Sequence, residues 1–68
     1  MDIATKIASR VLRRFAHENP KNITERNRIV RDEVEAEGYV TEIDITEITI
    51  QVAKSAERIR QNRDRRAS

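Results

Sequence analysis

The feature that most constrains this chain is its short supply of large apolar side chains. Its 68 residues include nine Ile and five Val, but only one Leu, one Phe and one Tyr. A chain of this length forms one domain, residues 1–68, and buries only about 60% of the surface that its unfolded form exposes. Domains with so thin a core are usually completed by a disulfide, a metal or oligomerisation.

The residue types present leave oligomerisation as the expected route. The sequence has no Cys, which excludes a disulfide and a thiolate metal site. His17 is the only histidine, and it could not build a zinc site without several carboxylates. We therefore expect a homodimer with no metal and no other cofactor.

Charge is distributed unevenly along the chain. Residues 1–20 carry a net charge of +2, residues 21–38 carry −1, residues 39–53 carry −3 and residues 54–68 carry +4. Eleven of the fourteen basic residues are Arg, which suits bidentate contact with phosphate or carboxylate. Both ends of the chain are thus basic, and the middle is acidic.

Residues 2–18 are predicted to form an amphipathic helix. Asp2 is favourably placed for the helix dipole, and Asn19-Pro20 ends the helix because a residue before proline is pushed out of the helical region. The apolar residues that share one half of the helical wheel are Ile3, Ala4, Ile7, Ala8, Val11, Leu12 and Phe15.

A second helix is predicted over residues 23–37. It opens with Asn22-Ile-Thr-Glu25, which matches a capping box, and Gly38 falls where a helix C-cap belongs. We expect its core-facing stripe to consist of Ile23, Val30 and Val34.

Residues 39–52 allow two interpretations, because they are rich in β-branched side chains. Ile43/Ile45 alternate as a strand would, so a short strand that pairs across a dimer is one alternative. A helical stripe runs without a break from Ile45 to Ile59, and Asp44-Ile-Thr-Glu47 offers a capping box. We therefore favour a helix over residues 45–64, preceded by an extended connector, and an all-α fold of three helices completed by homodimerisation.

A basic ridge on the first helix is one candidate binding surface. Its members recur at spacings of four, three and four residues, and a further arginine borders them: Lys6, Arg10, Arg13 and His17, with Arg14 alongside. They would span about 16 Å, comparable to several phosphate spacings along a duplex. The alternative is the solvated polar face that any amphipathic helix has.

The C-terminal tail is the second candidate. Beyond Ile59 there is no large apolar residue, and a helix with charge all round projects into solvent, frays, or lies against a polyanion. The arginines concerned are Arg58, Arg60, Arg63, Arg65 and Arg66.

Four apolar residues lie off the main stripes and form a predicted interface. They are Tyr39, Ile29, Ile43 and Ile50. A dimer contact is the simplest explanation, although the same face could dock another protein.

Three classes of function are disfavoured. Glu42, Asp44 and Glu47 would place carboxylates where a helix-turn-helix protein approaches phosphates. The first helix lacks the Trp and the strong hydrophobicity of a membrane-surface anchor. Since no nucleophile, phosphate-loop or zinc motif is present, we expect no enzyme.

Two functions remain open for what we expect to be a small cytoplasmic protein. The first is binding of nucleic acid through the basic residues of the first helix and of the tail, with contacts to phosphates. The second is a protein–protein adaptor or inhibitor that docks a partner through the Ile-rich face.

Overall fold

The computed structural model describes residues 2–67, with side chains described to residue 65. It contains three helices: α1 (Ile3–Glu18), α2 (Ile23–Ala36) and α3 (Glu42–Ala67). No strand occurs within residues 2–67, so helix is confirmed over strand for residues 45–52. The all-α, three-helix prediction is correct.

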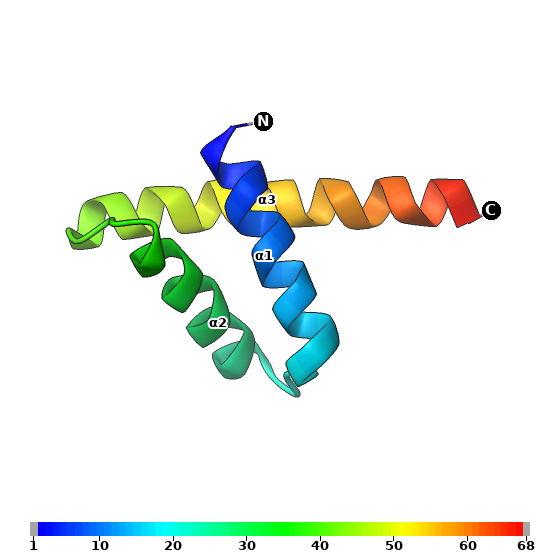
Figure 1. Cartoon of the computed structure of the whole chain (residues 1–68), viewed down its shortest axis with the longest axis horizontal. Helices are drawn as coiled ribbons and strands as arrows, with labels where there is room; N and C mark the ends of the chain where they lie inside the picture. Colours follow the sequence, from blue (N-terminus) through cyan, green and yellow to red (C-terminus); the bar gives the residue numbers. More distant parts are fainter. Residues whose placement is uncertain (1, 68) are drawn as a thin grey trace.

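Helices α1 and α2 both pack on the longest helix, α3, and they approach each other where the chain joins them. In Figure 1, α1 and α2 descend as a V from opposite parts of α3, and α1 crosses the middle of α3. The first part of the C-terminal half of α3 borders α1, and the last turns, coloured red, extend beyond it. The principal extents of 41 × 27 × 15 Å reflect this flat, elongated shape.

The helix ends follow the local sequence. The Asp2 carboxylate accepts a hydrogen bond from the Thr5 backbone N–H at 2.8 Å, and the Asn22 side chain accepts one from the Glu25 N–H at 2.9 Å. Asn19 adopts the left-handed conformation (φ 52°) and closes α1 through a bond to the Phe15 carbonyl. Each bond satisfies a backbone group that a helix end would otherwise leave unpaired.

The start of α3 differs from the prediction by three residues. Thr41 caps the helix, because its Oγ1 accepts a hydrogen bond from the Asp44 N–H at 3.2 Å. Asp44 therefore lies in the first turn instead of forming the cap, and the connector shortens to residues 37–41.

The core is small and lies where the three helices meet. Its buried apolar residues are Ala4, Ile7, Ala8, Val11, Ile29, Val34, Ile45 and Val52. Two of these eight are alanine, and Ser55 is buried as well, at 8% exposure. Small side chains let helices approach closely but bury little apolar surface. Each Å² of apolar surface that is buried stabilises the fold by about 25 cal/mol, so this core contributes little.

The predicted orientation of α2 is wrong in one respect. Ile29, expected outside the core, is only 5% exposed, whereas Ile23, expected in the core-facing stripe, is 65% exposed. Ile23 shares the helix face of Val34, but it is the first residue of α2, at the end that points away from α3 (Figure 1). Ile29 lies nearer the middle of α2, at the edge of a buried face wide enough to include Glu33 and Glu37, which lie beside the basic residues of α1.

Candidate nucleic-acid interface

Two members of the basic ridge of α1 contact a single carboxylate. The Lys6 Nζ lies 3.7 Å from Glu37 Oε1, and the Arg10 guanidinium donates a hydrogen bond to the same oxygen. Glu37 caps the C-terminus of α2, and its side chain is only 14% exposed. This ion pair therefore joins α1 to α2 and occupies the cations that the sequence offered for a phosphate.

Arg14 is surrounded by three acidic side chains. Its Nε lies 2.6 Å from Glu18 Oε2, and its Nη1 lies 3.5 Å from Glu33 Oε1 and 3.7 Å from Asp32 Oδ2. The hydrogen bond to Glu18 raises the pKa of Arg14, and the same bond lowers the pKa of Glu18. Arg14 thus contributes to the joint between α1 and α2.

Arg13 and His17 complete the ridge and lie on the exposed side of α1. Within the described part of the chain, no carboxylate lies within 4 Å of the Arg13 guanidinium. At this end of the predicted ridge, the Arg13 guanidinium therefore remains available to an anion from outside the chain.

The C-terminal half of α3 has a different environment. We call residues 54–67 the basic arm; it carries six basic and two acidic residues, a net charge of +4. Its basic side chains Lys54, Arg58, Arg60, Arg63 and Arg65 are all exposed. Arg66, also predicted to bind, has a side chain outside the described residues. The arm remains helical to Ala67, beyond the predicted end near residue 64.

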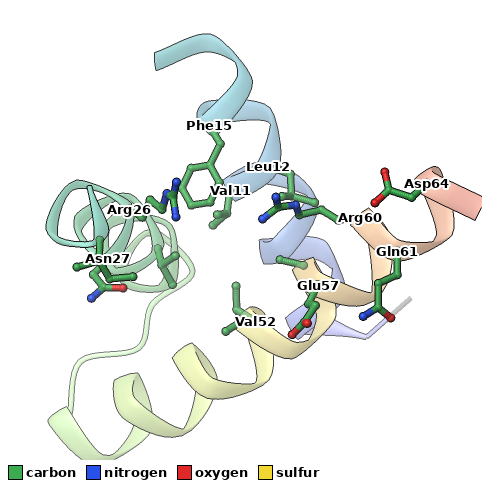
Figure 2. Close-up of a pocket in the computed structure, with 14 residues that line it drawn as sticks. Val11, Leu12, Phe15, Arg26, Asn27, Val52, Glu57, Arg60, Gln61 and Asp64 are labelled. Atoms are coloured by element: carbon green, nitrogen blue, oxygen red, sulfur yellow. The ribbon is translucent and has the colours of Figure 1, made fainter. Parts of the chain in front are cut away.

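Two arginines of the basic arm lie near one from α2. Arg60 and Arg63 line a hollow of about 300 Å³ at the end of α1 together with Arg26, and the lining contains no acidic residue. Figure 2 shows Arg26 and Arg60 on the two sides of Phe15 and Leu12, and both arginines are exposed. Three cations around one hollow form an attractive position for a phosphate or carboxylate.

An apolar groove adjoins this hollow. It has a volume of about 470 Å³ and runs between the three helices, with Val11, Leu12, Phe15, Ile23, Val30, Val52, Ala53 and Ala56 among its lining residues. Polar side chains of α2 and α3 border it, including Asn27, Glu57 and Asp64 (Figure 2). The exposed Ile23 belongs to this groove.

The predicted interface residues are divided between core and surface. Ile29 is buried and Tyr39 packs, partly buried, against the core, so neither offers a free apolar face. Ile43 and Ile50 are exposed at 73% and 52%. Val40, which the sequence reasoning missed, is 85% exposed.

The sequence reasoning also missed Arg26 and Glu37. Arg26 carries no motif, and its proximity to the basic arm depends on how α2 packs. A signal for Glu37 did exist, because residues 21–38 contain five acidic residues and follow a basic helix. Antiparallel neighbours of opposite charge are expected to pair.

Comparison with models of protein families, with curated proteins and with solved structures finds no match. Among the described residues, no three His, Asp or Glu side chains are grouped to hold a metal ion. Within the same residues, no helix combines the length and the apolar character needed to cross a bilayer.

Proposed function

We propose that this chain is a small non-enzymatic protein that binds nucleic acid through the basic arm of α3. The observation that carries the proposal is the arm's combination of net charge and exposure. It bears a charge of +4 and extends past the other two helices (Figure 1). The ridge of α1, by contrast, directs Lys6, Arg10 and Arg14 towards acidic side chains.

The arm has the dimensions and chemistry for contact with a phosphate backbone. Fourteen helical residues extend over about 20 Å, which spans several phosphates of one strand. Guanidinium groups bind phosphate oxygens in a bidentate manner, and such contacts position a protein without reading base sequence. Arg26, beside Arg60 and Arg63, adds a cation from α2. Affinity should therefore depend strongly on salt and weakly on sequence.

Fluorescence anisotropy of a labelled duplex of about 20 base pairs tests the proposal. We expect the logarithm of the association constant to fall linearly with the logarithm of the salt concentration, with a slope of about −3 for three or four phosphate contacts. Two duplexes of unrelated sequence should bind within about threefold of each other. Absence of binding at low salt, or an affinity independent of salt, would contradict the proposal.

A second candidate function, docking of another protein, is favoured by the exposed Val40, Ile43 and Ile50. Tagged protein purified with and without nuclease separates the two functions. A nucleic-acid binder loses its co-purifying material on nuclease treatment. An adaptor retains a protein partner after that treatment and loses it in the variant Ile50→Asp.

We further propose that the binding species is a homodimer, as the thin core led us to expect.

A further inference from the structure

A flank of α3 carries a second stripe, here called the outer stripe, which lies outside the buried core and borders the grooves between α3 and the other two helices. Its members alternate at spacings of three and four residues, and all are exposed: Ile43, Thr46, Ile50, Ala53, Glu57 and Arg60. The core-facing stripe of the same helix contains Ile45, Ile48, Val52 and Ile59 instead. Alternating spacings of three and four form the seam along which two helices pack as a coiled coil.

The two halves of α3 differ in charge. Residues 42–53 contain Glu42, Asp44 and Glu47 and no basic residue, a net charge of −3. The basic arm that follows carries +4. A parallel pair of α3 helices would place like charges side by side, whereas an antiparallel pair places each acidic half against a basic half.

We propose that a second copy of this chain packs on the outer stripe, with the two α3 helices antiparallel about a two-fold axis near Gln51 and Val52. In this register Ile50 packs against Ala53 of the second copy, a large side chain against a small one. Glu47 faces Lys54 of the second copy at the edge of the seam. The two-fold axis generates each contact twice.

The apolar groove explains how the exposed residues at the start of α3 are covered. Ala53, Glu57 and Arg60 belong both to the outer stripe and to the wall of the groove. The same register places Ile43 of the second copy against the stem of Arg60. That position borders the part of the groove lined by Leu12 and Phe15 (Figure 2).

The exposed area of the chain supports a second copy as the occupant. The accessible surface is 5284 Å². A compact monomer of 8.0 kDa exposes only about 4,450 Å² by the usual scaling of surface with mass. The flat, elongated shape thus leaves an excess of roughly 800 Å², which is comparable to the area that one partner buries in an interface of standard size.

This dimer goes beyond nucleic-acid binding and does not depend on it. In the proposed register the last residues of α3, from about residue 62, extend past the start of the partner helix. Arg63 of each copy therefore stays outside the contact, at opposite ends of the dimer. All measurements that follow use the protein alone, so that failure of the dimer and failure of nucleic-acid binding are distinguished.

Charge reversal tests the register. The full chain is studied by light scattering and by analytical ultracentrifugation over a range of concentrations. We expect a dimer whose dissociation constant rises at least tenfold in Glu47→Lys and likewise in Lys54→Glu, because each change opposes like charges twice. The double variant Glu47→Lys/Lys54→Glu should regain the dimer, since it restores both pairs.

The side chains of Glu47 and Lys54 are both exposed, and circular dichroism of each variant checks that it remains folded. A monomeric mass at every concentration would overturn the proposal. So would a double variant that associates no better than the single ones. A monomer that instead forms a mixed complex with another protein through Ile50 would also overturn it.

Cysteine cross-linking tests the antiparallel direction, and the absence of native Cys makes the result unambiguous. Chains carrying Ile50→Cys are mixed with chains carrying Ala53→Cys under mild oxidation. We expect a disulfide between the two kinds of chain to form at least tenfold faster than one between two Ile50→Cys chains. The reverse preference would indicate parallel helices and overturn the proposal.

Discussion

The ridge of α1 and the basic arm of α3 are both rich in basic residues, but their surroundings differ. Each places several basic residues at helical spacing on an exposed face. Across from the ridge lies α2, whose Glu33 and Glu37 pair with Arg14 and Arg10. The arm borders the end of α1, and Arg26 of α2 lies with Arg60 and Arg63 around one hollow whose lining contains no acidic residue.

The difference shows that a cation on a basic helical face is available to a polyanion only where no acidic side chain pairs with it. A paired arginine gives up an existing ion pair when it binds phosphate, which reduces the gain. An exposed arginine exchanges only water and counterions, and the release of counterions favours binding. The ridge therefore holds the fold together, and the arm carries the proposed function.

The largest expected effect compares nucleic-acid affinity after matched double substitutions. Arg60→Gln/Arg63→Gln in the arm should weaken duplex binding at least tenfold at about 50 mM salt, because two phosphate contacts are lost. Arg10→Gln/Arg14→Gln in the ridge removes the same charge and should change affinity less than about threefold. The measurement is fluorescence anisotropy, with circular dichroism as the check on folding. Equal losses in both variants would erase the distinction between ridge and arm.

A smaller effect concerns stability and compares two arginines of the ridge. Arg10→Gln should lower the free energy of unfolding by about 1 kcal/mol, because it removes a charged hydrogen bond to the mostly buried Glu37. Arg13→Gln, with no such partner, should cost less than about 0.5 kcal/mol. Urea denaturation of the two variants measures both values. The structural role of the ridge is contradicted if Arg13→Gln costs as much as Arg10→Gln.

The smallest effect is a dependence of stability on pH at the end of α1. The hydrogen bond from Arg14 holds the pKa of Glu18 below its usual value of 4.5. A carboxylate with a lowered pKa in the folded state stabilises the fold above its unfolded pKa, and this contribution is lost as the pH falls through the folded value. The difference in unfolding free energy between the natural chain and Glu18→Gln should therefore shrink as the pH falls from 6 to 3. A difference that stays constant over this range would contradict the assignment.

Much of the fold could be predicted because local chemistry determines it. Asn22 begins α2, and Asn19-Pro20 separates it from α1, through backbone hydrogen bonds within a few residues. The start of α3 was missed because Thr41 and Asp44 are both good capping residues three positions apart. The local sequence does not determine which of the two caps α3. In the structure the cap is Thr41.

The ion pairs between helices and the burial of Ile29 and Ile23 could not be predicted, because they depend on how the helices pack. The sequence identified the basic residues but not their partners, because an ion pair between helices requires the position of both. Ile29 is in the core because the buried face of α2 is wider than the predicted stripe, and Ile23 is exposed because it stands in the first turn of α2. These two differences removed Ile29 from the predicted interface and left Ile23 in the groove.

The most direct measurement of the difference between ridge and arm observes each arginine separately during binding. Nuclear magnetic resonance of the Nε–Hε groups, assigned in the full chain, is recorded as a short duplex is added. The account predicts that Arg60 and Arg63 shift on binding while Arg10 and Arg14 stay within experimental error of their free positions. Shifts at Arg10 and Arg14 with none at Arg60 and Arg63 would contradict it.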